Sequence, residues 1–252
     1  MTVTDVNVVK SAIFERPDDA NKGTLGSLLC VCGSYGMAGA AVMSAKGALR
    51  TGIGLAKCAL PRSVYPIVAQ TILESVYYPL SENADGRISK VNVPFLVSES
   101  CKSSATLVGC GLGVCDDTLK IVFSFIENST TPLVLDADAL NCVAKQPEIL
   151  LRKKAPIIIT PHPGEMSRLT GLATPLVNAE RERVALDFAQ KYGVVTVLKG
   201  AGTVIASPNG KVLVNPTGNS GMATGGSGDV LAGMTASILA QGASAFSSAA
   251  AA

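Results

Sequence analysis

The sequence has little of what several protein classes require. Only 16% of its 252 residues are charged, the formal net charge is +2, and it contains one histidine and no tryptophan. The lysines and arginines are scattered, so they form no basic patch for a nucleic acid or a membrane surface. No apolar run approaches the roughly 20 residues of a membrane span. We therefore expect neither a nucleic acid nor a membrane as a partner.

The cysteines and the histidine also exclude some chemistry. With one histidine and no C-x-x-C pair, the sequence argues against a zinc site. It also lacks the G-x-S-x-G motif, which argues against a hydrolase built on that histidine. The seven cysteines are odd in number and mostly lie in apolar segments such as "LLCVCG". Buried, reduced thiols are typical of the cytoplasm, and we expect a cytoplasmic protein.

Apolar runs alternate with helical patterns along the chain, which predicts a parallel sheet covered by helices on both faces. This is an α/β fold, a three-layer α/β/α sandwich. Residues 203–216 alternate around Pro-Asn-Gly and predict a late hairpin at one edge of the sheet. No repeat or linker divides the chain, so we predict a single domain over residues 1–252. The expected strands are 27–32, 55–60, 105–111, 132–137, 156–160 and 194–200, and the expected helices are 36–52, 116–128, 137–146 and 178–193.

Turns that carry glycine, aspartate or histidine follow these strands. Ligands of wound α/β sheets bind beyond the carboxyl ends of the strands, so these turns predict a site. The first, "GSYGMAGAA", is neither the dinucleotide fingerprint nor a P-loop, and close helix packing is an alternative explanation of its small residues. The turns are "GSYGMAGAA" (33–41), "GCGLGV" (109–114), "DADALN" (136–141), "TPHPGE" (160–165), "KGAGT" (199–203) and "NPTGNSGMATGGSGD" (215–229).

Two of these turns hold candidate reactive groups. The loop "GGSGD" lets backbone N–H groups approach anionic oxygens, and Asp229 stands at the start of the following helix. An ionised carboxylate beside a phosphoryl group fits a base that takes the proton of an attacking hydroxyl; a helix-capping aspartate is the alternative. His162 lies between two prolines that stiffen its loop, and Glu165 follows in the first turn of a helix. A capping glutamate and a simple loop histidine are the alternative there.

With these motifs in order, the chain resembles the ADP/ATP-dependent NAD(P)H-hydrate dehydratases, a family of the ribokinase-like superfamily. The resemblance extends from "KGTLG" (22–26) through "GSYGMAGAA", "RTGIG", "GCGLG", "LDADAL", "TPHPGE" and "VLKGAGT" to "GGSGD". It implies a ribokinase-like fold and a lyase reaction. In that reaction ADP or ATP phosphorylates the ring hydroxyl of the S epimer of hydrated NADH or NADPH, and phosphate elimination restores the dinucleotide.

The resemblance also implies roles for individual residues. Asp229 would be the catalytic base, and Gly225, Gly226, Ser227 and Gly228 would form the phosphate loop. The nucleotide would contact Lys199, Gly200, Ala201, Gly202, Thr203 and Gly228, and the hydrated dinucleotide would contact Ala40, Gly111, His162 and Asp229. The implied cofactors are ADP or ATP and Mg²⁺. Metal ligands are left unassigned, as are the choice between ADP and ATP and that between the two hydrates.

The C-terminal end departs from the family, which continues past "GASAFSSAAAA" (242–252). We interpret the alanine run, a strong helix former, as the start of a truncated or incompletely identified helical element. The length leaves no room for the epimerase domain fused to some relatives, so we expect a separate NAD(P)H-hydrate epimerase as functional partner. We also expect a homo-oligomer, with a tetramer as one option.

Three alternatives remain open. The nearest is a ribokinase-superfamily kinase of a vitamin-precursor alcohol such as hydroxyethylthiazole, which would keep "GGSGD" without a pocket for a dinucleotide. A nicotinamide-dependent oxidoreductase is disfavoured because G-x-G-x-x-G is missing. A non-catalytic nucleotide sensor would not need Asp229.

Overall fold

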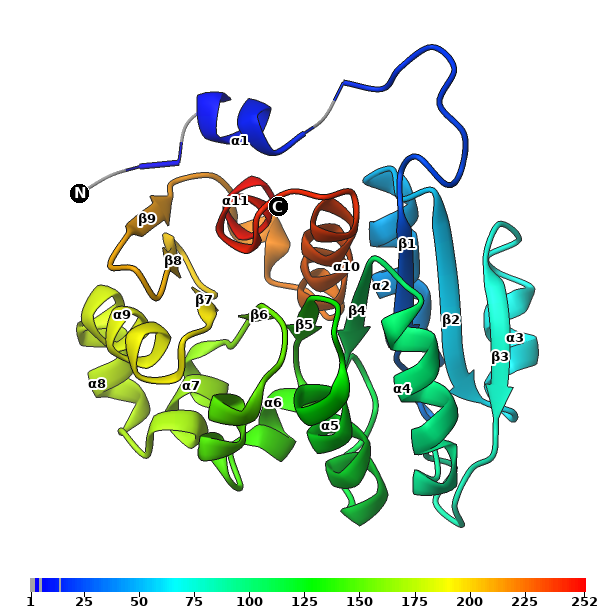
Figure 1. The fold of residues 1–252 in the computed structure, drawn as a ribbon. Coiled ribbons are helices and arrows are strands. Elements are labelled where there is room, and N and C mark those ends of the chain that lie inside the picture. Colours follow the sequence, from blue (N-terminus) through cyan, green and yellow to red (C-terminus); the bar gives the residue numbers. More distant parts are fainter. Residues whose placement is uncertain (1–2, 5, 14) are drawn as a thin grey trace.

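A single nine-stranded sheet organises the computed structural model, which describes residues 3–4, 6–13 and 15–252 (Figure 1). The strand order is β3-β2-β1-β4-β5-β6-β7-β8-β9. All neighbours from β3 to β7 pair in parallel, whereas β7–β8 and β8–β9 are antiparallel. This confirms the mostly parallel sheet with a late hairpin at one edge. The strands are β1 Ser27–Val31, β2 Leu55–Pro61, β3 Val76–Leu80, β4 Ala105–Val108, β5 Leu133–Leu135, β6 Ile157–Ile159, β7 Val195–Leu198, β8 Thr203–Ala206 and β9 Val212–Asn215.

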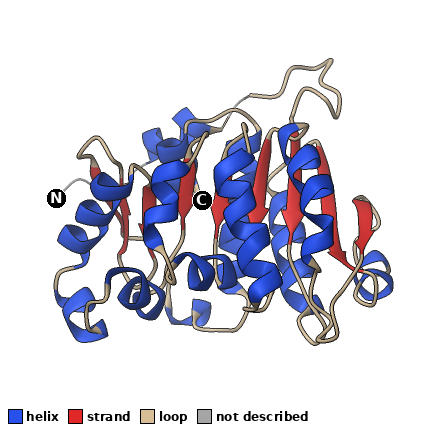
Figure 2. Cartoon of the chain, turned by 60° about the horizontal axis from the view of Figure 1, so that its bottom comes forward, coloured by secondary structure: helices blue, strands red, loops and turns tan. Residues whose placement is uncertain are grey.

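Helices cover both faces of this sheet (Figure 2). In β1, Leu29 and Val31 belong to one buried apolar cluster, and Leu28 and Cys30 to the other. Helices α4 to α9 complete the first cluster, and α2, α3, α10 and α11 complete the second, so the predicted three-layer sandwich is confirmed. The helices are α1 Val6–Ala12, α2 Ala38–Arg50, α3 Tyr65–Ala69, α4 Val93–Cys101, α5 Asp116–Asn128, α6 Asp138–Val143, α7 Pro163–Thr170, α8 Thr174–Ala179, α9 Arg181–Tyr192, α10 Ser227–Ala240 and α11 Ala245–Ala251, with 3₁₀ helices η1 Lys90–Asn92, η2 Pro147–Arg152 and η3 Ser220–Met222.

Small residues set the distance between α2 and α10. A Cβ atom on Gly233 would lie 2.0 Å from the carbonyl oxygen of Ser44, and one on Gly47 would lie 2.7 Å from that of Val230. The two backbones therefore touch, which only glycine permits at these positions. This close contact holds the start of α10 over the sheet.

Residues 178–193, expected as one helix, form two. Helix α8 ends at Ala179, Glu180 leaves the helical conformation with φ −125° and ψ 41°, and α9 begins at Arg181. At the break, an Arg181 guanidinium nitrogen donates a hydrogen bond to the carbonyl oxygen of Leu198, at 2.8 Å. The tertiary contact with the end of β7 thus accompanies a bend that the helical periodicity did not indicate.

The edge strand β3 and the helices α3 and α4 were not predicted. Strand β3 contains Pro79, which lacks a backbone N–H and is tolerated at a sheet edge. The terminal alanines form the helix α11, as expected from their propensity. Within the described part of the chain, no helix is both long enough and apolar enough to cross a membrane.

Candidate functional site

The carboxyl ends of the parallel strands meet at one rim of the sheet. Strand β1 lies between β2 and β4, so the strand order runs outward in both directions from β1 and β4. Wound α/β folds bind ligands at such a topological switch point. Backbone hydrogen bonds hold the turns together: the N–H of Gly33 donates to the carbonyl of Cys110 (2.8 Å), and that of Lys199 donates to Pro161 (2.9 Å). The predicted turns after β1, β4, β5, β6 and β7 therefore share one rim.

Asp136, directly after β5, is the most buried charged group of the rim. Its side chain is 2% exposed. Its Oδ1 atom accepts hydrogen bonds from Lys199 Nζ and from Thr160 Oγ1, both at 2.7 Å. Burial lowers the pKa of Lys199, but Asp136 and Glu165 outweigh it and raise that pKa above its ordinary value. The sequence patterns alone predicted no role for Asp136, although an aspartate that directly follows a buried strand is a usable signal.

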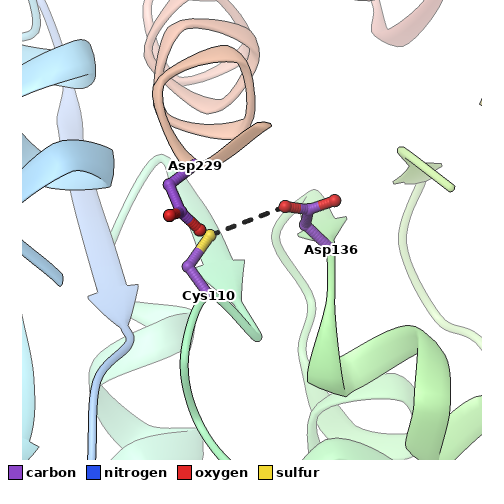
Figure 3. A group of neighbouring side chains, drawn as sticks. All are labelled: Cys110, Asp136 and Asp229. Atoms are coloured by element: carbon purple, nitrogen blue, oxygen red, sulfur yellow. Dashed lines mark hydrogen bonds between the residues drawn. The ribbon is translucent and has the colours of Figure 1, made fainter. Parts of the chain in front are cut away.

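Asp229 faces this group from the first turn of α10. Gly226, with φ +93°, occupies the N-cap position, so Asp229 is not the capping residue of its helix. Instead its carboxylate lies near Cys110 and Asp136, and the three ligating atoms lie within 4.8 Å of one another (Figure 3). Burial and the negative charge of Asp136 raise the pKa of Asp229, although a thiol hydrogen bond from Cys110 lowers it.

The two carboxylates make Asp229 a stronger base than an ordinary aspartate. Two like charges about 4 Å apart repel by roughly 4 kcal/mol at an effective dielectric near 20. A proton or a nearby cation relieves this repulsion. The arrangement can therefore accept a proton from a bound hydroxyl.

The glycine-rich loop lies beside Lys199. A Cβ atom on Gly228 would be 3.4 Å from Lys199 Nζ, and one on Gly225 would meet nothing within 4 Å. The backbone N–H groups at the start of α10, the positive end of its helix dipole and the Lys199 ammonium group therefore lie together beside the loop. Such a place suits an anion. The structure brings the predicted phosphate loop and Lys199 together.

The turn after β7 borders a cavity of about 500 Å³. Gly200 and Gly202 have φ of +153° and +68°, which favour glycine. Arg181 lies against this turn, since a Cβ atom on Gly200 would be 2.8 Å from its guanidinium. The cavity is lined by residues 178–183 together with Ala201, Gly202, Val204 and Val214.

His162 and Glu165 cap helix α7 reciprocally. His162 Nδ1 accepts hydrogen bonds from the backbone N–H groups of Gly164 (3.0 Å) and Glu165 (3.3 Å), and Glu165 Oε2 accepts one from that of His162 (2.7 Å). Glu165 is therefore a capping residue, and His162 caps the same helix rather than being a simple loop histidine. The ring is still half exposed at the rim, and burial together with the charges of Lys199 and Arg168 lowers its pKa, which favours the neutral imidazole. Its contact with the substrate stays a prediction.

Ala40 and Gly111 form a second group near the switch point. Gly111 has φ +62°, and a Cβ atom there would lie 2.7 Å from the Cβ of Ala40. Cys110, next to Gly111, was missed by the sequence analysis as a site residue. Its thiol pKa is well above the ordinary value because of a hydrogen bond with Cys32, burial and the nearby carboxylates.

Comparisons with known proteins indicate one family. Residues 28–252 match the family model described as NAD(P)H-hydrate dehydratase. The chain is 39% identical to the bifunctional NAD(P)H-hydrate repair enzyme Nnr of Moorella thermoacetica, over 92% of this chain and 44% of the relative. It is 36% identical to the ADP-dependent (S)-NAD(P)H-hydrate dehydratase of Neisseria meningitidis serogroup B, over 93% of this chain and 76% of the relative.

A solved structure is similar over nearly the whole chain. The ADP/ATP-dependent NAD(P)H-hydrate dehydratase from Bacillus subtilis, co-crystallized with ATP/Mg²⁺, superimposes with a TM-score of 0.84 and 30% identity, covering 99% of this chain and 85% of that one. The chain spans less than half the length of the bifunctional relatives that it matches.

Proposed function

Because this chain belongs to the NAD(P)H-hydrate dehydratase family, we propose that it repairs hydrated NADH or NADPH. The reaction is the nucleotide-dependent dehydration of the S epimer, in which ADP or ATP phosphorylates the ring hydroxyl and phosphate is then eliminated. The single observation that carries the proposal is Asp229, a carboxylate of raised pKa beside a glycine loop and Lys199.

In the first step, Asp229 takes the proton of the ring hydroxyl as its oxygen bonds to the transferred phosphorus. The bond between that phosphorus and the donor's bridging oxygen breaks. Residues 225–228 and Lys199 hold the negative oxygens through backbone N–H groups and a positive charge. In the second step, the ring carbon–oxygen bond breaks and its electron pair leaves with the phosphate. The neighbouring ring carbon gives a proton to solvent, and the electrons of that carbon–hydrogen bond form the double bond.

The nucleotide fits the residues around the turn after β7. Lys199, Gly200, Ala201, Gly202, Thr203 and Gly228 would contact it, and the cavity of about 500 Å³ beside Gly202 has room for its base and ribose. Mg²⁺ fits as well, because it binds through one or two carboxylates plus phosphate oxygens, and Asp136 Oδ2 is not used by Lys199. When bound, Mg²⁺ supplies positive charge to the phosphates. We propose ADP or ATP as the donor without distinction.

The remaining predicted contacts would bind the substrate. Ala40 and Gly111 would approach the dinucleotide closely because neither carries a long side chain. His162 would hydrogen-bond or stack with it in its neutral form. A separate epimerase that interconverts the two hydrate epimers is the proposed functional partner, and the name of the bifunctional relatives supports this pairing.

We place the protein in the cytoplasm as a homo-oligomer. All seven cysteines are free, which supports a reducing compartment. Analytical ultracentrifugation tests the oligomer, and a sedimentation coefficient of a monomer at micromolar concentration would contradict it.

The decisive experiment incubates the protein with the S hydrate of NADH or NADPH and with ADP or ATP plus Mg²⁺. Return of the dihydronicotinamide absorbance together with release of inorganic phosphate is the expected result. A stable phosphate ester without recovery of absorbance would instead identify a small-molecule kinase, which the names of the relatives do not favour. Nucleotide binding with no turnover of any hydrate would leave the sensor alternative.

A further inference from the structure

The three side chains of Figure 3 have a feature that proton transfer does not use: one of them is a thiol. Cys110 comes from the turn after β4, Asp136 from the turn after β5 and Asp229 from the start of α10. Cys110 Sγ lies 3.8 Å from Asp136 Oδ2. All three ligating atoms lie within 4.8 Å of one another.

The distance between Cys110 Sγ and Asp136 Oδ2 is close to that between two ligand atoms around one small metal ion. Zinc–sulfur and zinc–oxygen bonds of about 2.3 and 2.0 Å at a tetrahedral angle separate the two ligand atoms by roughly 3.5 Å. The observed 3.8 Å between Cys110 and Asp136 differs little from this value. Three protein ligands also leave a fourth position for water or a phosphate oxygen.

The charges and partners of these groups favour a cation. Lys199 and Thr160 both bind Oδ1 of Asp136, so Oδ2, on a side chain that is 2% exposed, faces only the weak thiol donor. Lys199 is shared with Glu165, whose Oε2 lies 3.9 Å away. The positive end of α10 and Lys199 oppose a cation, but Asp136, Asp229 and Glu165 together carry more negative charge than Lys199 offsets.

We propose that Cys110, Asp136 and Asp229 bind a thiophilic divalent cation such as Zn²⁺, and that this ion inhibits the enzyme by taking Asp229 as a ligand. The thiol loses its proton to solvent as the sulfur–metal bond forms, and no oxidant or reductant takes part. A thiolate selects zinc, cobalt or cadmium over Mg²⁺, which prefers oxygen. The sequence argued against zinc because no C-x-x-C pair is present, but here the ligands come from separate turns. The inhibition, unlike the binding, rests on the proposed function.

The binding test is a titration of the metal-free, full-length protein with Co²⁺, which reports thiolate ligation by an intense near-ultraviolet charge-transfer band. The wild type should bind one equivalent with this band. Cys110→Ser should lose the band, and Asp229→Asn should weaken Co²⁺ binding at least about tenfold while its thiol is intact. Cys101→Ser, which changes an exposed thiol at the end of α4, should behave like the wild type.

Absence of the band in the wild type, or its persistence in Cys110→Ser, would overturn the site. A band lost in Cys32→Ser but kept in Cys110→Ser would also overturn it, by moving the thiol ligand to the neighbouring cysteine. Circular dichroism confirms that each variant is folded, so that a missing band reports a missing ligand.

The inhibition test measures hydrate dehydration in excess Mg²⁺ with increasing Zn²⁺. The wild type and Cys101→Ser should lose activity near equimolar Zn²⁺. Cys110→Ser, compared with its own activity without zinc, should need at least about ten times more. Co²⁺ binding without zinc inhibition would overturn the inhibitory role. If no variant dehydrates the hydrate, the proposed function fails while the Co²⁺ titration still decides the metal site.

Discussion

Two carboxylate–lysine groups differ in how their charges balance: a partly exposed one around Glu99 on α4, and the buried one at the rim. Glu99, on α4, meets Lys102 Nζ at 2.9 Å, the hydroxyl of Tyr78 at 2.9 Å and Lys57 Nζ at 3.9 Å. Two lysines thus pair with one carboxylate. Hydrogen bonds from Lys102 and Tyr78 lower the pKa of Glu99, although burial alone would raise it.

At the rim the ratio is reversed. One lysine, Lys199, pairs with both Asp136 and Glu165, and a third carboxylate, that of Asp229, lies near Asp136. Burial raises the pKa of Glu165 and of Asp229 in spite of Lys199. A structural ion group thus balances its charges internally, whereas the rim retains negative charge that a proton, a metal ion or a ligand can neutralise.

Asp229→Asn should have the largest effect. We expect kcat to fall by about 10²–10⁴-fold, because the base for the hydroxyl proton is lost. Nucleotide affinity should stay near that of the wild type or rise slightly, since a charge that repels phosphate is removed. Steady-state kinetics and calorimetry measure the two quantities. Glu99→Gln, the matching change in the structural group, should keep its turnover. A rate above about a tenth of wild type in Asp229→Asn would end its role as the base.

Valine at Gly200 or Gly202 should weaken nucleotide binding about tenfold and hydrate binding less. Both positions have positive φ, where a β-branched side chain costs about 1–3 kcal/mol, and the added bulk would meet the ligand. Gly210→Val is the matched control, because Gly210 also has positive φ (+93°) but lies in the turn between β8 and β9. Calorimetry measures the affinity for the nucleotide and for the hydrate. Equal losses of affinity for both ligands would refute the prediction that this turn contacts the nucleotide.

His162→Asn should raise KM for the hydrate severalfold and change kcat much less. Asparagine is also a good N-cap, so α7 is retained while the imidazole contact is lost. The pKa of His162 is lowered, so protonation of its ring should not change much above about pH 6.5, the ordinary pKa of histidine. The wild-type kcat should therefore be independent of pH above about 6.5. A kcat depressed about a hundredfold at unchanged KM would make His162 a catalytic group.

Glu99→Gln should have the smallest effect, a loss of about 1 kcal/mol in unfolding free energy at neutral pH. The folded-state pKa of Glu99 is lowered, so its stabilisation is present above the ordinary pKa of about 4.3 and is lost as the pH falls through the lowered value. Urea unfolding of variant and wild type should therefore differ at pH 7 and converge in acid. A difference that grows toward acid pH would show that the two lysines do not stabilise the ionised form.

Apolar runs and helical periodicity are local patterns, and they were enough to predict most strands and helices and the three layers, but not β3, α3, α4 or the break at Glu180. The helix 116–128 agrees with α5, and the strands expected at 27–32 and 55–60 agree with β1 and β2 to within a residue. The parallel order of the sheet then placed the glycine-bearing turns on one rim. The roles of Asp229, His162 and the other predicted contact residues stay predictions.

Only the tertiary structure decided how the side chains of the rim meet. The contact of Asp136 with Lys199 joins residues 63 positions apart, and that of Cys110 with Asp136 joins residues 26 apart. The break at Glu180 accompanies a contact between Arg181 and the end of β7. Such contacts depend on strand order and burial rather than on neighbouring residues, and burial sets the pKa values on which the chemistry of the rim depends.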